Sequence, residues 1–533
     1  MNNTRHEDTV FPLHQEIDAR CRASFRSLCP APELLNRVES KNKIAQISPL
    51  TDLPTICLAQ GRRSDVVAAF ERGRRAQKRW AQLPIKERAR RTVRLINALW
   101  AHREQLLDVI QWESGKARVD ANEELTDQLS IARYLKGPFY KVLKPQRAKG
   151  LLPFLTRVDI HRVPLGVVGV ISPWNFPLTL ITNDAIFALI AGNAVVIKPD
   201  TKTPLTALVI RQLMNDCGFE DDIFQVVCGV GEDIGPDIVE HADYVMFTGS
   251  SETGTQVATR CAQRLVECSL ELGGKNPLIV LEDADVEKAV PGARRAFLAN
   301  NGALCLSIER IYVHEKLWDK FVPAFIDCVN TTRIEASLSW QADMGVLISR
   351  EHLQIVAQHV DDAVQKGATI LTGGYALPKI APTAYAPTVL VDVTEDMDVY
   401  SKETFGPLVS LYPFKDEEEV IRLANDSNYG LNCSIWGKPS HARRIAQHIR
   451  TGTVVINDAY ASAWSSIDAP MGGMGISGIG RRHGKEGFIK YTDTQSVVTQ
   501  HLFPLFTPRF LTHRAFGKLT GFGMRVLTYI PWV

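Results

Sequence analysis

Short apolar runs rich in β-branched residues alternate with helix-like segments through the middle of this chain, and this alternation is its most constraining feature. The runs lie at 166–172, 194–198, 224–227, 244–247 and 277–280. The helical candidates lie near 180–191, 203–217, 233–240 and 251–268. Strands that alternate with helices form a parallel sheet with right-handed crossovers, because each helix returns the chain to the same edge. We therefore expect a Rossmann-type α/β domain, the architecture that binds dinucleotides.

A second region of strand–helix alternation, from about 275 to 470, predicts a second α/β domain. Its strand candidates are IERIYVHE, ATILTG, PTVLVDV, LVSLYPF, SIWG and TVVIN, with a helix near 315–330. Ahead of the first domain, 64–82 and 86–116 carry apolar residues at helical spacing. Residues 1–40 are polar without a strong period, so we expect an N-terminal extension or a loosely docked arm.

Composition excludes several classes of protein. The 533 residues carry a formal net charge of +2, which gives no general case for a nucleic-acid partner. The ten cysteines form no CxxC pair and no zinc-type cluster, so reduced thiols and no metal site are expected. The N-terminus lacks the apolar core of a signal peptide, and no run of 18 apolar residues occurs. A cytoplasmic protein is the expectation.

Two turns follow predicted strands at positions where a ligand binds in α/β folds. Asn175 lies in ISPWNFPL between two prolines, where its amide can be held rigidly, although on this motif alone an ordinary Asx turn is the more common explanation. FTGSSETG (247–254) ends a strand and opens a helix whose free N–H groups attract phosphate. It is not a G-x-G-x-x-G fingerprint, so an ordinary strand–helix turn remains an alternative.

Two further residues have chemistry to offer but are ambiguous in isolation. Glu271 precedes two glycines in ELGGKNP, and a surface carboxylate is the common interpretation of such an acid. Cys305 ends NNGALC, and a single cysteine is usually a small buried hydrophobe. The order and spacing of these motifs therefore matter more than any of them alone.

Taken together, the motifs resemble the aldehyde dehydrogenase superfamily over about residues 45–500. The matching elements are PWNFP at Asn175, Lys198–Pro199, the FTGS turn, ELGGK at Glu271, Cys305, ETFGP at 403–407 and a tail ending in SGIGRRHG. The segments KPDTKTP, CLSIERIYV, PMGGMGISGIGRRHG and IKYTDTQ look most like a bacterial, actinobacterial-type succinate-semialdehyde dehydrogenase branch.

The resemblance implies a catalytic trio. Cys305 would attack the aldehyde carbon as a thiolate and form a thiohemiacetal, then a thioester. The Asn175 amide and the Cys305 backbone N–H would hold the oxyanion. Glu271 would be the general base for the water that hydrolyses the thioester.

The resemblance also implies an NADP or NAD site. Lys198 would bind the adenosine ribose, Gly249 and Ser250 would border the pyrophosphate, and Glu403 and Phe405 would hold the nicotinamide ribose and ring. The remaining expected cofactor residues are Ser172, Pro173, Trp174, Thr201, Gly231, Phe247, Thr248, Gly254 and Leu272. Thr201 stands where NAD-preferring members carry a glutamate, which favours NADP.

The family's organisation implies how the chain divides. After the 1–40 extension, residues 41–141 with 165–273 would form the NAD(P)-binding domain. Residues 142–164 with 486–503 would form a small oligomerisation element of a homodimer or homotetramer. The catalytic domain would span 274–485, and 504–533 would be a basic and apolar C-terminal tail.

The sequence departs from the family at three further places and leaves the aldehyde open. Ala303 replaces a common glutamine, Gly475 a lysine and Met471 a phenylalanine. Succinate semialdehyde is the first candidate, but no cation can be assigned to its carboxylate. At the positions that line the substrate tunnel in the family, this chain has Leu180, Asn183, Leu304 and Leu306. This mostly apolar set would suit medium- or long-chain aliphatic or aromatic aldehydes as well.

Two other classes were considered. An acylating, coenzyme A-dependent enzyme needs no general base, and Glu271 argues against it. A non-catalytic binding or structural relative would be expected to lose Cys305 or Asn175, and both are present.

The tail after residue 500 has no acidic residue but carries Arg509, Arg514, Lys518 and Arg525. On a helical wheel, one apolar arc lies beside the basic side chains; its members are Leu511, Ala515, Leu519, Phe522, Val526 and Ile530. A basic amphipathic helix is typical of peripheral membrane contact. Three glycines weaken such a helix, which favours the alternative that the tail docks on the partner subunit or on the chain's own catalytic domain.

Overall fold

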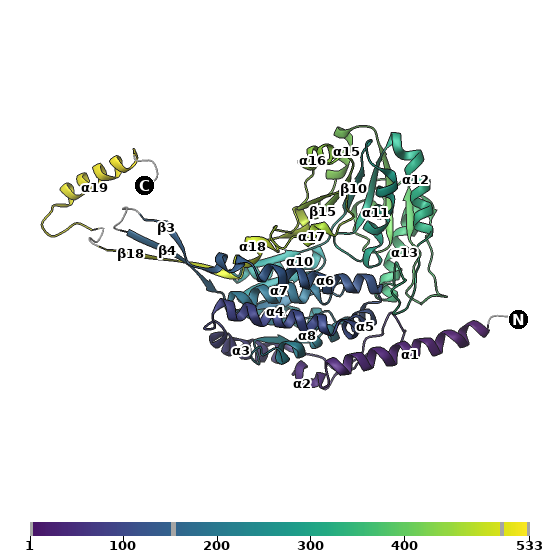
Figure 1. The fold of residues 1–533 in the computed structure, drawn as a ribbon, viewed down its shortest axis with the longest axis horizontal. Helices are drawn as coiled ribbons and strands as arrows, with labels where there is room; N and C mark the ends of the chain where they lie inside the picture. The colour runs from purple at the N-terminus through teal and green to yellow at the C-terminus, as the bar shows by residue number, and fades with distance from the viewer. Residues whose placement is uncertain (1–3, 151–155, 502–505, 530–533) are drawn as a thin grey trace.

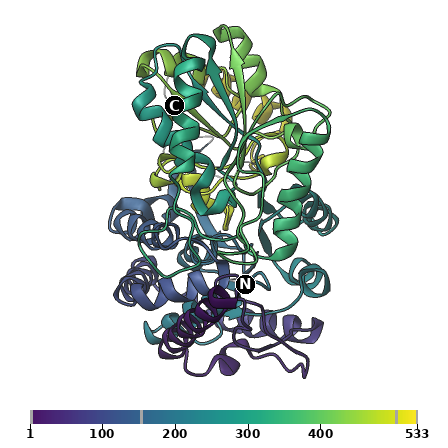
Figure 2. The ribbon, with the colours of Figure 1, turned by 90° about the vertical axis from the view of Figure 1, so that its right-hand side faces the viewer.

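The computed structural model describes residues 4–150, 156–501 and 506–529, and the chain forms two α/β lobes with an arm that projects from one of them (Figure 1). Seen from the side, the lobes stack one above the other, with the first half of the chain below and residues from about 280 onward above (Figure 2). The α/β fold with parallel sheets predicted from the alternation is confirmed. Residues 151–155, 502–505 and 530–533 of the expected oligomerisation element and tail, including Ile530, lie outside the described residues.

The first lobe contains a six-stranded sheet in the order β17-β9-β8-β5-β6-β7. Its strands are β5 (Val167–Ile171), β6 (Ala194–Lys198), β7 (Phe224–Val226), β8 (Tyr244–Thr248), β9 (Cys268–Glu271) and β17 (Gly478–Ile479). Five strands are parallel and almost wholly buried, as expected for a sheet covered by helices on both faces. The chain runs outward from β5 through β6 and β7, then returns to the other side as β8 and β9. A ligand crevice is expected beyond the carboxyl ends of β5 and β8, where the strand order reverses.

Helices surround this sheet. They are α3 (Arg63–Trp80), α4 (Ile85–Ala101), α5 (Arg103–Ser114), α6 (Arg118–Leu135), α7 (Thr179–Ala191), α8 (Pro204–Asp216), α9 (Gly231–His241) and α10 (Ser251–Gln263). The helical stretch expected at 86–116 breaks at His102, whose φ of −101° and ψ of 23° leave the helical region and separate α4 from α5.

The N-terminal segment differs from the expected loose arm. It forms α1 (Thr4–Leu28), followed by the short α2 (Pro32–Asn36), and Cys21 and Phe25 are fully buried. Apolar residues at 17, 21, 25 and 28 recur at helical spacing and pack in the core of the first lobe. The Arg20 guanidinium donates to both carboxylate oxygens of Asp108 on α5, at 3.0 and 2.9 Å. The many polar residues between the apolar positions hide this period in the sequence.

The second lobe contains a seven-stranded sheet in the order β12-β13-β14-β11-β10-β15-β16. Its strands are β10 (Asn276–Val280), β11 (Ile308–His314), β12 (Thr369–Thr372), β13 (Thr388–Val391), β14 (Leu408–Phe414), β15 (Asn432–Trp436) and β16 (Thr453–Ile456). Its helices are α11 (Val286–Leu298), α12 (Glu315–Asn330), α13 (Arg350–Gln365), α14 (Asp398–Ser401), α15 (Glu417–Asn425), α16 (Pro439–Ala446) and α17 (Ser462–Ser465).

Two segments connect the lobes. The strand at 277–280, which follows the first run of alternation in sequence, belongs to the second sheet, and the chain crosses over at Leu272–Lys275. In return, β17 comes from the glycine-rich stretch of the second lobe and pairs antiparallel with β9, with Gly478 opposite Glu271. Gly478 has φ of +146°, and a Cβ there would lie 2.1 Å from the Leu270 carbonyl oxygen, so only glycine fits this edge.

The projecting arm is a three-stranded antiparallel sheet in the order β18-β4-β3. It is formed by β3 (Gln146–Lys149), β4 (Thr156–Pro164) and β18 (Thr492–Gln500), and α18 (Gly484–Ile489) leads into it. Beyond the arm, α19 (His513–Leu527) lies apart from both lobes (Figure 1). Within residues 506–529 no side chain is buried, so docking of the tail on the chain's own catalytic domain is absent from these described residues.

Candidate active site

The turn before Cys305 holds three consecutive residues in the left-handed backbone region. Asn300, Asn301 and Gly302 have φ of 51°, 60° and 74°. Asparagine and glycine are the residues that adopt this conformation most readily. A Cβ on Gly302 would lie 2.0 Å from the Gly406 carbonyl oxygen, so the turn also requires glycine because the backbones approach closely. The sequence NNG therefore directs Cys305 to the boundary between the lobes.

Asn175 lies opposite this turn, in the loop that follows β5. Its side-chain Nδ2 donates to the Ala303 carbonyl oxygen at 3.0 Å, and Ala303 is two residues from Cys305 in the sequence. The Asn300 amide donates to the carbonyl oxygens of Asn175 (3.1 Å) and Ala303 (2.8 Å) and ties the two loops together. Each Nδ2 carries two hydrogens, so the Asn175 amide retains one for an oxyanion.

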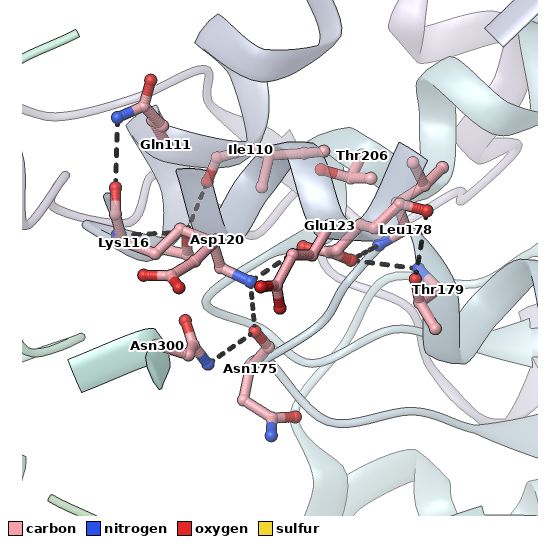
Figure 3. A network of polar contacts seen from close by, with 12 residues as sticks. Ile110, Gln111, Lys116, Asp120, Glu123, Asn175, Leu178, Thr179, Thr206 and Asn300 are labelled. Atoms are coloured by element: carbon pink, nitrogen blue, oxygen red, sulfur yellow. Dashed lines mark hydrogen bonds and ion pairs between the residues drawn. The ribbon is translucent and has the colours of Figure 1, made fainter. Parts of the chain in front are cut away.

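A buried ion pair supports the Asn175 loop from behind. Lys116 Nζ donates to Glu124 Oε1 at 2.8 Å and to the Asn175 carbonyl oxygen at 2.6 Å, and both charged side chains are fully buried. Glu124 Oε2 accepts from the backbone N–H groups of Leu178 (2.8 Å) and Thr179 (3.0 Å). Figure 3 shows how Lys116 and Asn300 converge on the Asn175 carbonyl. The pair thus fixes the PWNFP loop at Asn175 and at the two residues that follow the motif.

Glu271, at the end of β9, is buried and not a surface acid. Its Oε1 has no hydrogen-bond partner. Burial raises the pKa of this carboxyl to about 7, although the positive charges of Arg482 and Lys490 act in the opposite direction. A carboxylate with a pKa near neutrality is suited to taking a proton from water.

Two buried acids lie within electrostatic reach of Cys305. Burial raises the pKa of its thiol to about 12, and the charges of Glu271 and Glu403 contribute to the rise. Glu403 Oε1 accepts from the Gly274 N–H at 2.8 Å, and burial raises the pKa of this carboxyl to about 8. Protonation of these two acids removes the charges that oppose formation of the thiolate.

Asn175 and Cys305 line a cavity of about 80 Å³ between the lobes, and this cavity is the candidate substrate tunnel. Its apolar wall includes Leu180, Leu304 and Leu306, as expected, and also Phe176, Trp464 and Met471. Glu123, Glu124, Asp127, Asn183, Arg482 and His483 supply polar groups. The tunnel therefore combines an apolar wall with a polar one.

A second cavity, of about 670 Å³, lies beyond the carboxyl ends of β5 and β8. The expected cofactor residues that line it are Ser172, Pro173, Trp174, Lys198, Thr201, Gly231, Phe247, Thr248, Gly249 and Ser250. The N-terminal ends of α9 and α10 border it, at Gly231 and Ser250. Helix N-termini present free N–H groups to anions, so the cavity fits the diphosphate of a dinucleotide.

Four expected cofactor residues do not line this cavity. Gly254 and Leu272 pack together, since a Cβ on Gly254 would meet the Leu272 side chain at 2.5 Å. Glu403 binds Gly274, and Phe405 packs at right angles to Trp174 with ring centroids 5.5 Å apart. The Glu403 loop is held by Glu309, which accepts from the Phe405 N–H at 3.0 Å.

The sequence pattern does not single out several residues that the structure places at the candidate site. Lys116, in the connection between α5 and α6, and Glu124, on α6, have the sequence pattern of an ordinary charged surface, and only their complete burial distinguishes them. Arg482 is buried, donates to both carboxylate oxygens of Asp184 at 3.1 and 2.7 Å, and lies within electrostatic reach of Glu271. The cofactor cavity also contains Asp200, next to Thr201.

With this geometry established, comparison with known proteins identifies the family. The aldehyde dehydrogenase family model matches residues 37–497, so the chain belongs to the aldehyde dehydrogenase family and is an oxidoreductase. The resemblance seen in the motifs is confirmed.

Individual relatives show which members of the family this chain is similar to. A Mycobacterium ulcerans protein, provisionally named succinate-semialdehyde dehydrogenase (NADP+) 2, is 46% identical over 461 residues, 86% of this chain and 88% of the relative. A Mycolicibacterium smegmatis protein, provisionally named succinate-semialdehyde dehydrogenase (NADP+), is 45% identical over 510 residues, 96% of this chain and 98% of the relative. An NAD+ complex of a Bacillus cereus aldehyde dehydrogenase superimposes with a TM-score of 0.82 at 32% identity, covering 86% and 93% of the two chains.

The Lys116–Glu124 pair gives a first prediction. Lys116→Met should lower the free energy of unfolding by about 3–5 kcal/mol, because removal of one partner leaves a buried carboxylate without its counter-charge. Urea unfolding followed by fluorescence measures the loss. Lys288→Met is the matched control, since the Lys288–Asp285 pair is exposed and its removal should leave the unfolding midpoint unchanged. Equal midpoints for the two variants would contradict the structural role of Lys116.

Proposed function

We propose that the chain oxidises an aldehyde to a carboxylic acid through a covalent thioester on Cys305, with NADP as the preferred cofactor. The observation that carries the proposal is the convergence of Cys305, Asn175 and Glu271 at the boundary of the two lobes. In this arrangement the first lobe would hold the cofactor and the second would carry the nucleophile.

The contacts support a catalytic role for each of the three residues. The Cys305 thiolate would form a C–S bond with the aldehyde carbon, and the oxygen would take the negative charge. The free hydrogen of the Asn175 amide would stabilise that oxyanion, since Lys116 and Asn300 hold the loop in place. NADP, when bound, accepts the hydrogen and electron pair that the aldehyde carbon loses. Glu271 would then take a proton from water as it attacks the thioester, and cleavage of the C–S bond would release the acid and restore the thiolate.

Cofactor choice is proposed from Thr201. A glutamate at this position would repel the 2′-phosphate of NADP, and like-charge contact can cost several kcal/mol. Thr201 lines the cofactor cavity without a negative charge, with Lys198 on the same wall. The negative charge nearest to Thr201 is that of the neighbouring Asp200. Its Oδ1 accepts a hydrogen bond from the Lys202 N–H at 2.9 Å, which partly compensates this charge. The relatives named as NADP-dependent enzymes support this preference.

Succinate semialdehyde is the proposed substrate, and the names of the relatives support it. A second candidate is an uncharged aliphatic or aromatic aldehyde, because the tunnel has a broad apolar wall. The guanidinium that lines the tunnel, Arg482, is already paired with Asp184, so it offers only part of its hydrogen-bonding capacity to a carboxylate.

Assembly and location are also proposals. The arm strand β18 is exposed along most of its length, which suits a homodimer or homotetramer built through the β18-β4-β3 sheet. Among the described residues, no helix is long and apolar enough to cross a membrane. We propose a cytoplasmic enzyme whose tail contacts anionic membrane surfaces, because the apolar side chains of α19 are exposed beside Arg514, Lys518 and Arg525.

The catalytic assignment predicts distinct effects for two substitutions. Cys305→Ala should abolish oxidation while cofactor binding persists. Glu271→Gln should give a burst of reduced cofactor followed by a slow steady state, because deacylation loses its base. Because the pKa of Glu271 is about 7, wild-type turnover limited by deacylation should rise as the pH increases through that value. Cys57→Ala, at an exposed thiol, is the control, and near-normal turnover of Cys305→Ala would refute the assignment.

The cofactor proposal predicts a switch. Wild-type enzyme should prefer NADP in kcat/KM, and Thr201→Glu should reverse the preference by about tenfold or more, since the carboxylate repels the 2′-phosphate and binds the free 2′-hydroxyl. Initial rates with each cofactor measure it, with Thr126→Glu on the exposed face of α6 as control. A tenfold preference of wild-type enzyme for NAD would contradict the proposal.

The substrate proposal predicts a ranking. Succinate semialdehyde should have a higher kcat/KM than butanal, which has the same chain length without the carboxylate. Steady-state rates at matched cofactor concentration decide the ranking. Equal values would remove the case for a carboxylate site and favour a general aliphatic-aldehyde dehydrogenase.

The membrane proposal predicts that the enzyme sediments with phosphatidylserine vesicles at low salt and not with phosphatidylcholine vesicles. Each basic residue near an anionic surface contributes about 1 kcal/mol, so high salt should weaken binding. Truncation after Gln500 should abolish sedimentation and retain aldehyde oxidation. Absence of binding at low salt, with an altered oligomeric state after truncation, would establish docking on a partner subunit instead.

A further inference from the structure

The charges that line the substrate tunnel are almost all paired. Glu124 binds Lys116, and Glu123 binds Arg295 at 2.5 Å through its Oε1. Arg482 binds Asp184. Burial lowers the pKa of His483 to about 4, so this side chain is uncharged at neutral pH.

Asp127, on α6, is the exception. It is buried, lines the same tunnel as Cys305, and has no cationic partner among the described residues. A substrate that carries a carboxylate would therefore meet the Asp127 side chain in this wall. The cation that lines the tunnel, Arg482, is already paired with an acid.

The hydrogen bonds of Asp127 show where a proton on it would reside. Its Oδ2 accepts from the Asn183 amide at 2.8 Å and from the Gln128 amide at 3.4 Å. Its Oδ1 has no hydrogen-bond partner. An oxygen that accepts from two amide donors is a poor site for a proton, so a protonated Asp127 carries its hydrogen on Oδ1.

The groups that face Asp127 favour this protonated form near neutral pH. Burial, assisted by the charge of Glu124, raises the pKa of Asp127 to about 7, and Arg482 and the Asn183 hydrogen bond act against the rise. Thr179 faces this carboxyl from α7, and its hydroxyl, which also donates to the Glu124 carbonyl oxygen at 3.4 Å, acts against the rise as well. His483, on the opposite segment, contributes no charge.

We propose that Asp127 is a specificity-determining residue that recognises the distal carboxylate of a semialdehyde substrate by donating a hydrogen bond from its Oδ1. The inference rests on the proposed function and specifies how a tunnel without an unpaired cation accepts an anion. A hydrogen bond between a carboxylic acid and a carboxylate is charge-assisted and correspondingly strong. Once ionised, the same side chain repels the substrate.

This arrangement makes substrate preference dependent on pH. The donor is present below the pKa of Asp127 and is lost as the pH rises through about 7. Succinate semialdehyde should thus be favoured at the acidic end and disfavoured at the alkaline end, while butanal, which has no carboxylate, should not respond to Asp127.

The experiment measures the ratio of kcat/KM for succinate semialdehyde to that for butanal between about pH 6 and about pH 9. Both aldehydes use the same thiol and base, so the ionisations of Cys305 and Glu271 cancel in the ratio. We expect the wild-type ratio to fall by about tenfold to a hundredfold across this range, as the protonated fraction of Asp127 declines. This measurement needs no variant and is therefore independent of folding defects.

Two variants sharpen the test. Asp127→Asn replaces the Oδ1 hydroxyl with an amide donor that does not titrate, so the ratio should become independent of pH and exceed the wild-type ratio at the alkaline end. Asp127→Ala removes the donor, and its ratio at the acidic end should fall at least tenfold below that of the wild-type enzyme. Glu71→Gln, at an exposed acid on α3, controls for the change in net charge and should keep the wild-type profile.

The outcomes separate the two proposals. If wild-type enzyme oxidises both aldehydes with a ratio that is constant with pH, the proposed function stands and the role of Asp127 is refuted. If it oxidises butanal and not succinate semialdehyde at any pH, the substrate proposal and the role of Asp127 both fail. If Asp127→Asn retains the wild-type pH profile, another group is responsible for the dependence and the assignment is overturned.

Discussion

The buried ion pair between Lys116 and Glu124 is the interaction on which the geometry of the site depends. Lys116 holds the Asn175 carbonyl, and Glu124 holds the two backbone N–H groups that begin α7, so one pair orders the whole PWNFP loop. In a low-dielectric interior such a pair is costly to form and costlier to break, which makes it a rigid support. The turn that precedes Cys305 is then tied to this loop through Asn300.

Around this ion pair, the site contains buried acids whose desolvation is only partly offset by hydrogen bonds and nearby positive charges. Burial raises the pKa values of Glu271 to about 7, Glu403 to about 8 and Asp127 to about 7. Each of these carboxyl groups can therefore change charge within the physiological range, which few unperturbed side chains can do. The same acids oppose ionisation of Cys305, so the reactivity of the thiol depends on the protonation of its neighbours.

The local patterns of the sequence predicted most of the regular structure. Alternation located β5, β6, β7 and β8 within one or two residues, because buried parallel strands are continuous apolar runs. It failed where the pattern was mixed. The pattern predicts a loose arm for amphipathic α1 because its buried positions are separated by charged residues, and it does not indicate β9 because CSLE contains two polar residues.

The sequence by itself determined the family, because Asn175, Glu271 and Cys305 stand in motifs whose order is specific, and it predicts these three residues as the catalytic trio. It also determined the NNG turn, since only asparagine and glycine adopt that backbone readily. Tertiary structure alone decided which charged residues matter. In the sequence, four of these look like ordinary surface residues: Lys116, Glu124, Asp127 and Arg482. In the folded protein, the buried Lys116–Glu124 pair supports the Asn175 loop, Asp127 lines the tunnel and Arg482 places a positive charge near Glu271. The physical reason is that desolvation and pairing are properties of the folded environment, which residue type and spacing do not encode.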